Sequence, residues 1–320
     1  MRLVAAAAFL ASLACGFSAA AQGKFPERPI RIISPFGAGG LADITMRLVG
    51  QKLMERTGQG VVIENRPSAG GILAAGAVTA AAPDGYTLFV LSSGLAISKS
   101  VVKAMPFDPV TAFAPISTVA YFDLLLVAKG DSPLRNVADM LGAARSDPAK
   151  FNIGAISPGS TQNVTGHFVR SATGVGMTIV PFRGTPEVTT ALMRGEVTIG
   201  VETYAALKGQ IDHGELRAIG STGDVRSQAL PDVPTLRESG IAVEVMGWNA
   251  LVAPAGTPPA IIDTLNAHVR AIVESEDFKK RMSDLGTQAR ASTPAELGAR
   301  LAGDVAMWAD VVKRAGIEPM

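Results

Sequence analysis

Short apolar runs alternate with longer helical stretches along the first third of this chain. The β-branched runs at 30–34, 60–65 and 87–91 are typical of buried strands. Between them, residues 41–56 carry apolar side chains at helical spacing and residues 72–82 are rich in alanine, so both stretches predict helices. This alternation of strands and helices predicts mostly parallel sheets with helices on both faces.

A second series of the same kind follows. Its predicted elements are strands at 124–128, 151–156, 177–181, 197–201 and 217–221 with helices at 137–145, 161–173, 186–193 and 204–211, and then a strand at 248–253 with helices at 258–274 and 294–315. We therefore expect two α/β lobes, the first formed by residues 24–122 and 248–320 and the second by residues 123–247. The chain is expected to cross between the lobes near residues 119–126 and 240–250.

The N-terminus has the pattern of a secretory signal peptide. Arg2 is followed by a short apolar run and then by Ala19-Ala20-Ala21, which matches an Ala-x-Ala cleavage site. We expect residues 1–21 to be removed before Gln22 and the mature protein to lie in the periplasm. Cys15 is the single cysteine; it is either discarded with the signal or, as the alternative, carries a lipid anchor.

The composition narrows the class of protein. Hydrophobic residues make up 48% of the chain and charged residues 18%, which suits a globular protein and excludes a disordered one. The net charge of +1 leaves no basic surface for nucleic acid or anionic lipid. His167, His213 and His268 lie far apart, without the spacing of a metal site. We therefore expect a soluble protein with no metal, no cofactor and no nucleic-acid partner.

The loop Pro35-Phe36-Gly37-Ala38-Gly39-Gly40 lies between a predicted strand and a predicted helix. Glycines let the backbone approach a ligand, and a helix start presents free N–H groups and a partial positive charge. This combination predicts a site for an anion such as a carboxylate. The loop also matches the dinucleotide pattern G-x-G-x-x-A, with Glu64 as the ribose carboxylate, so an NAD(P) site is the alternative.

A second motif, Ala155-Ile156-Ser157-Pro158-Gly159, imitates the nucleophile elbow of serine hydrolases. In those enzymes the backbone N–H after the serine stabilises the oxyanion, and Pro158 has no N–H. A serine hydrolase is therefore excluded. The remaining interpretation is a polar loop over residues 157–162 at a helix start, where Ser160 or Thr161 either caps the helix or contacts a ligand.

Three charged residues near these loops have two interpretations each. Asp43 falls in the first turn of a predicted helix, where its carboxylate either favours the helix dipole or positions the glycine loop. Glu202 ends a predicted strand, where α/β sheets bind ligands; otherwise it is a solvated strand end. Arg183 either pairs with a ligand carboxylate or forms a structural salt bridge.

Several sequence blocks together resemble one family. They are FPERPIRIISPFGAGGLADITMR, GVVIENRPSAGG, APDGYTL, VPFRGTPEVTTALMRGEV, LPDVPTLRESG and APAGTP, and they run in order from about Phe25 to Ile317. These blocks resemble the Bug-type extracytoplasmic solute receptors of the tripartite tricarboxylate transporters. The resemblance implies a two-lobed, type II periplasmic-binding-protein fold that closes around its ligand.

The resemblance also implies a function. Receptors of this family bind small carboxylates, such as citrate, other dicarboxylates, acidic amino acids or aromatic acids, and deliver them to membrane subunits of a transporter. Some report to a sensor kinase instead. We therefore expect a monomeric binding protein and not an enzyme. The residues expected to contact the ligand are Phe36, Ala38, Gly39, Gly40, Asp43 and Ser93 in the first lobe and Ser157, Gly159, Ser160, Thr161, Gln162, Arg183 and Glu202 in the second.

This chain departs from the family pattern beside its predicted site. Ala42 stands where a Ser or Thr is common, Asn163 where many members have His, and Glu202 where Asp is usual. These changes leave the identity of the ligand open. The alternative function from a different class is an exported NAD(P)-dependent oxidoreductase that uses the same glycine loop.

Overall fold

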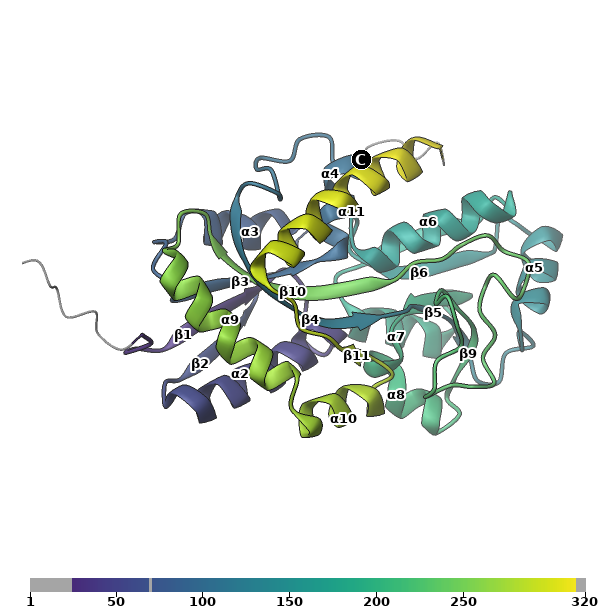
Figure 1. Ribbon diagram of the computed structural model, residues 1–320. Helices are drawn as coiled ribbons and strands as arrows, with labels where there is room; N and C mark the ends of the chain where they lie inside the picture. The colour runs from purple at the N-terminus through teal and green to yellow at the C-terminus, as the bar shows by residue number, and fades with distance from the viewer. Residues whose placement is uncertain (1–24, 69–70, 315–320) are drawn as a thin grey trace, which may run out of the picture.

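The computed structural model describes residues 25–68 and 71–314, which form two β-sheets covered by helices (Figure 1). The strands are β1 (Ile30–Ser34), β2 (Val61–Asn65), β3 (Thr87–Ser92), β4 (Phe113–Phe122), β5 (Leu125–Lys129), β6 (Asn152–Ile156), β7 (Thr178–Phe182), β8 (Ile199–Glu202), β9 (Leu216–Ser221), β10 (Gly247–Pro254) and β11 (Gln288–Ala289). The helices are α2 (Leu41–Thr57), α3 (Ile72–Thr79), α4 (Ser93–Val101), α5 (Val137–Ser146), α6 (Thr161–Thr173), α7 (Thr185–Arg194), α8 (Tyr204–Asp212), α9 (Pro259–Val273), α10 (Glu276–Asp284) and α11 (Pro294–Arg314). This arrangement confirms the predicted α/β fold class, while the predicted signal peptide lies outside the described residues.

The first sheet has the strand order β11-β4-β10-β3-β1-β2 and is covered on both faces. Successive side chains of a strand point to opposite faces. Ile32 of β1 therefore packs in the cluster that contains Met46 of α2 and Val269 of α9, whereas Ile33 packs with Ala74 of α3. Both isoleucines are fully buried, which stabilises the sheet by roughly 1.5–3 kcal/mol for each side chain.

The second sheet has the order β7-β6-β8-β5-β9, and within the described residues both sheets are mixed. Strands β1 and β6 pair in parallel with both neighbours, but β5 and β10 run antiparallel to theirs. The predicted parallel pairs are therefore present, and antiparallel pairs through β5 and β10 make each sheet mixed. The lobes meet at the ends of β3, β4, β8 and β9. Strands β5 and β10 start in this region, each after the chain has crossed from the other sheet.

The two crossing segments are held together at Thr222. Its hydroxyl donates to the carbonyl of Val245 over 2.7 Å and accepts from the N–H of Leu124 over 2.9 Å. Its backbone N–H also donates to the carbonyl of Leu124 over 2.8 Å. Thr222 is fully buried, so these bonds are shielded from water and fix where the two segments pass each other.

Helix α11 runs along the first sheet toward α6 of the second (Figure 1). Trp308 of α11 stacks on Phe168 of α6, with ring centroids 5.2 Å apart. The indole N–H of Trp248 in β10 donates to Asp304 of α11 over 2.6 Å. The C-terminal helix therefore contacts the first sheet and, through α6, the second lobe. The elements that the sequence pattern did not predict are β4, α4, α10 and β11.

Candidate ligand-binding cleft

Five helices begin around one cavity between the two sheets. Its lining includes the first residues or the N-caps of α2, α4, α6, α7 and α8, namely Gly40, Ser92, Thr161, Gly184 and Thr203. The first N–H groups of a helix have no partner inside the helix, and its N-terminus carries a partial positive charge. The cavity is small, about 30 Å³. Its geometry therefore favours a compact group that carries negative charge and accepts hydrogen bonds.

Three buried polar atoms of the lining have no hydrogen-bond partner among the described residues: Ser92 Oγ, Thr203 Oγ1 and Asn249 Nδ2. Their residues are at most 2% exposed. Ser92 and Thr203 are N-cap residues, yet neither side chain caps its helix, whereas Ser160 accepts the N–H of Asn163 in the usual way. Unpaired buried polar groups are rare because each costs free energy, so these three atoms point to a ligand.

Ser92 and Asn249 lie side by side in the first lobe. They are directly paired across the antiparallel strands β3 and β10, and side chains at paired positions share one face of the sheet. An amide next to a hydroxyl offers both donors and acceptors to a ligand. Thr203, at the end of β8, presents its hydroxyl from the second lobe. The cavity therefore has unsatisfied polar groups on both sides.

The carboxylate of Asp43 holds the glycine loop in place through hydrogen bonds. The Asp43 carboxylate accepts the N–H of Gly39 over 3.0 Å, pairs with Arg47 over 2.9 Å and accepts the amide of Asn65 over 3.0 Å. Burial acts to raise the pKa of Asp43, but the hydrogen bonds from Arg47, Gly39 and Asn65 outweigh it and lower the pKa. Gly39 has a φ of 83°, a left-handed conformation that suits glycine. The N–H of Gly39 is thus engaged within its own lobe.

Glu202 lies behind the lining on the second lobe and is fully buried. Its carboxylate accepts the hydroxyl of Thr185 over 2.6 Å, the N–H of Thr203 over 3.0 Å and the amide of Gln162 over 3.4 Å. Burial raises the pKa of Glu202, and these three hydrogen bonds offset the rise only in part. All three partners, Thr185, Thr203 and Gln162, line the cavity, so Glu202 orients them.

The two lobes meet along one side of the cavity. The hydroxyls of Ser93 in α4 and Thr161 in α6 lie 2.9 Å apart, and Ser98 donates to the carbonyl of Gly159 over 2.9 Å. On another side, the backbones of Gly37 and Gly184 approach closely enough that a Cβ on either would touch the other residue's Cα at 3.8 Å. The lobes are therefore in close contact on two sides of the cavity.

The residues predicted from the sequence fall into three groups. Some line the main cavity, some line a neighbouring cavity of about 10 Å³, and the rest lie outside both. The residues that line the main cavity are Phe36, Gly40, Thr161 and Gln162. Those that line only the neighbouring cavity are Ser157, Gly159 and Ser160. Those outside both cavities are Ala38, Gly39, Asp43, Ser93, Arg183 and Glu202. Arg183 lies in an outer cleft with Ser157, and the main lining contains no Lys or Arg.

Sequence reasoning missed several lining residues, of which Ser92, Thr185, Thr203 and Asn249 are polar. Asn249 carried a signal, because it is a polar residue inside an otherwise apolar strand that is buried along its whole length. Thr203 directly follows Glu202 at the end of a strand, a position where α/β sheets bind ligands. Thr185 had no comparable signal, because Thr is also common at surface helix starts.

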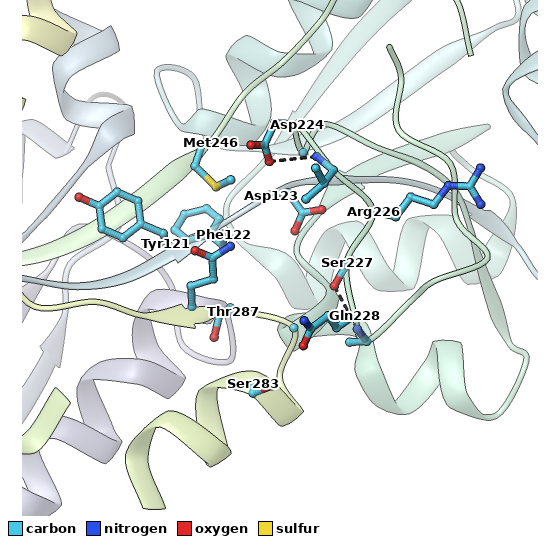
Figure 2. Close-up of a pocket in the computed structure, with 15 residues that line it drawn as sticks. Tyr121, Phe122, Asp123, Asp224, Arg226, Ser227, Gln228, Met246, Ser283 and Thr287 are labelled. Atoms are coloured by element: carbon cyan, nitrogen blue, oxygen red, sulfur yellow. Dashed lines mark hydrogen bonds between the residues drawn. The ribbon is translucent and has the colours of Figure 1, made fainter. Parts of the chain in front are cut away.

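A larger cavity of about 320 Å³ lies behind the crossing segments (Figure 2). Asp123 and Asp224 line it, while Arg226 extends away from Asp123 and pairs with Glu238. Burial raises the pKa of Asp123, partly offset by the hydroxyl of Ser221, and the charge of Asp224 raises it further. This cavity has neither the convergent helix starts nor the unpaired buried atoms of the cleft, and its two carboxylates disfavour an anion.

The described residues contain no group of three or more His, Cys, Asp or Glu side chains placed to hold a metal ion. Likewise, no helix in the described part of the chain is both long enough and apolar enough to cross a membrane.

Known proteins match this chain over most of its length. The family model described as "Tripartite tricarboxylate transporter family receptor" matches residues 45–317. The structure of the periplasmic binding protein BugD is 30% identical, has a TM-score of 0.89, and the match covers 92% of this chain and 100% of that one. R. palustris Rpa4515 with adipate is 31% identical, with a TM-score of 0.89 and coverage of 93% and 100%. MatC from Rhodopseudomonas palustris with bound malate is 30% identical, with a TM-score of 0.85 and coverage of 90% and 100%. These matches confirm the predicted resemblance and the periplasmic-binding-protein fold.

Proposed function

We propose that this chain, which belongs to the tripartite tricarboxylate transporter receptor family, captures a small carboxylate between its lobes and delivers it to the membrane subunits of such a transporter. The proposal includes export to the periplasm after removal of residues 1–21. It also assigns residues 24–122 and 248–320 to one lobe and residues 123–247 to the other. Adipate and malate, bound by two of the similar structures, are the first ligands to test.

The observation that carries the proposal is the set of unpaired atoms on Ser92, Thr203 and Asn249. A buried polar group without a partner costs about 1–3 kcal/mol, and a ligand that bonds to all three would recover this free energy on binding. Five helix starts around the same cavity favour a negative charge without any Lys or Arg in the lining. A carboxylate meets both conditions, because it is an anion that accepts several hydrogen bonds.

The predicted contacts keep distinct roles in this proposal. Gly40, Thr161 and Gln162 contact the ligand with the three unpaired side chains, because they line the same cavity. Asp43 and Glu202 act through other residues: the first positions the glycine loop, and the second orients Thr185 and Gln162.

The oxidoreductase alternative finds less support in the geometry. Glu64, which would bind the ribose, instead pairs with Arg66 over 2.6 Å and with Arg31 over 3.5 Å. Binding without chemistry therefore fits the cleft better.

A thermal-shift screen tests the proposal, because a ligand that binds only the folded form raises the melting temperature. The panel contains mono-, di- and tricarboxylates, including adipate and malate, with NAD and NADP in parallel. At least one acid should raise the Tm. Asn249→Leu should abolish that rise without lowering the Tm of the free protein, because Asn249 Nδ2 has no partner to lose.

Asn266→Leu is the matched control. Asn266 is also buried, but its amide donates to the carbonyls of Ile116 and Ser292 over 2.7 and 2.9 Å. Its replacement should lower the Tm of the free protein and preserve the ligand-induced rise. A panel in which no acid raises the Tm, or in which NAD does so instead, would overturn the proposed function.

A further inference from the structure

Glu202 is a buried carboxylate that has no cation as a partner among the described residues. It is fully buried, and its three hydrogen-bond partners, Thr185, Thr203 and Gln162, are all neutral. A buried charge is expensive unless a counter-charge accompanies it. The cavity it adjoins is surrounded by helix starts that favour an anion. A carboxylate ligand would therefore bring a second negative charge close to the first.

Thr185 lies between Glu202 and the glycine loop. Its Oγ1 donates to Glu202 over 2.6 Å, and it also faces Gly40, since a Cβ on that glycine would stand 3.2 Å from Oγ1. A hydroxyl has one hydrogen. While Thr185 donates to an ionised Glu202, it can present only lone pairs to a ligand, and lone pairs repel a carboxylate.

From this geometry, and resting on the proposed function, we infer that Glu202 takes up one proton from solvent when a carboxylate enters the cleft. The protonated carboxyl then donates its hydrogen to Thr185 Oγ1. Thr185 in turn rotates its own hydrogen toward the ligand and donates to the carboxylate. No covalent bond to carbon changes, and the net event is the transfer of one proton from water to Glu202. Glu202 thereby sets the cleft's preference for anions without contacting them.

The charged groups of the surrounding elements do not offset the negative charge of Glu202 in place of this proton. Strand β8 packs against β5, β6, α6 and α7, and β6 contains no charged residue. The charged side chains of the other three elements have partners elsewhere: Lys129 with Asp131, Arg170 with His167, Glu187 with the N–H of Arg183, and Arg194 with Glu196. Within the described residues of these elements, no cation is therefore left to neutralise Glu202.

The direction of the pH dependence follows from linkage. Burial raises the pKa of Glu202 in the free protein, and a bound anion raises the pKa further because like charges repel. Between these two values, binding takes up a proton, so affinity is highest on the acidic side and falls as pH rises. The limiting slope is about a tenfold loss of affinity per pH unit.

Titration calorimetry measures this uptake directly. Using the acid of the panel that raises the Tm most, binding enthalpies are compared in buffers with different heats of ionisation, between about pH 5 and about pH 8. The wild type should take up as much as about one proton per ligand. Glu202→Gln should bind with no uptake and with nearly constant affinity across this range, because the Gln amide donates to Thr185 at every pH. Thr185→Val should bind more weakly and lose most of the uptake.

Two control variants test whether a carboxylate other than Glu202 takes up the proton on ligand binding. Asp123→Asn removes the other described carboxylate with a raised pKa, and Glu187→Gln removes an exposed carboxylate on the helix of Thr185. Both should keep the wild-type uptake.

The outcomes separate the two proposals. Binding by the wild type without proton uptake would overturn this inference and leave the proposed function standing. So would uptake that persists in Glu202→Gln, or a Gln variant that binds more weakly at every pH, since Glu202 would then accept a bond from the ligand itself. No binding by any acid would overturn both.

Discussion

At the scale of single residues, Asp43 shows how a carboxylate beside a site can act without contacting the ligand. It bonds to Gly39, Arg47 and Asn65, and Asn65 also donates to the carbonyl of Phe36 over 3.0 Å. We expect Asp43→Asn to lower the free energy of unfolding by about 1–3 kcal/mol at neutral pH, because a buried charged acceptor is lost. It should also weaken carboxylate binding, because the glycine loop loses its support. Urea denaturation and calorimetry measure the two effects.

The pH dependence of this effect has a definite sign. The pKa of Asp43 is lower in the folded protein than in the unfolded chain, so its contribution to stability is present above the unfolded value and disappears as pH falls through the folded one. The free energies of unfolding of the variant and the wild type should therefore become equal in acid. Asp212→Asn is the control, since Asp212 pairs with Lys208 at the same helical spacing on the surface. If Asp43→Asn and Asp212→Asn lost equal amounts of unfolding free energy, the role of Asp43 in holding the glycine loop would be contradicted.

At the scale of elements, Ser92 and Ser160 are both N-cap residues that line the neighbouring cavity, but their hydroxyls have different roles. Ser160 accepts the N–H of Asn163 over 3.1 Å and so caps α6, whereas Ser92 leaves α4 uncapped and its hydroxyl unpaired. Ser160→Ala should cost about 1 kcal/mol of stability. Ser92→Ala should leave stability unchanged or slightly raised and should weaken carboxylate binding. Denaturation and calorimetry on both variants check this, and a stability loss in Ser92→Ala would mean that its hydroxyl is not free.

Individual helices show how much of the fold could be predicted from the sequence. Helices such as α6 and α9 were predicted within a residue or two, because each buries one apolar face at the helical period. Helix α4 was not, because it is buried on nearly all sides and includes Gly94 and three serines, so it has no polar face to contrast with an apolar one. The glycine loop was evident from its own residues, but the pairing of Ser92 with Asn249 needs strands far apart in the chain, which no local pattern reveals.

At the scale of the whole molecule, closure depends on how near α4 can approach the loop before α6. A Cβ on Gly94 would stand 3.0 Å from the backbone N of Thr161 and 3.2 Å from the carbonyl O of Gly159. Backbone atoms cannot rotate away as a side chain can. The contact between Ser93 and Thr161, and that between Ser98 and Gly159, therefore require a glycine at this position of α4.

Gly94→Ala should consequently hold the lobes apart. Alanine favours a helix over glycine by up to about 1 kcal/mol, so α4 itself should not be weakened, and the added methyl acts only on the contact with the other lobe. We expect a larger radius of gyration in solution scattering with a saturating carboxylate, together with weaker binding. Gly142→Ala in α5 is the control, because a Cβ there meets nothing within 4 Å and the same gain in helix propensity applies. If Gly94→Ala bound and compacted like Gly142→Ala, the approach of α4 to α6 would not limit closure, and the lobes would have to close about some other contact.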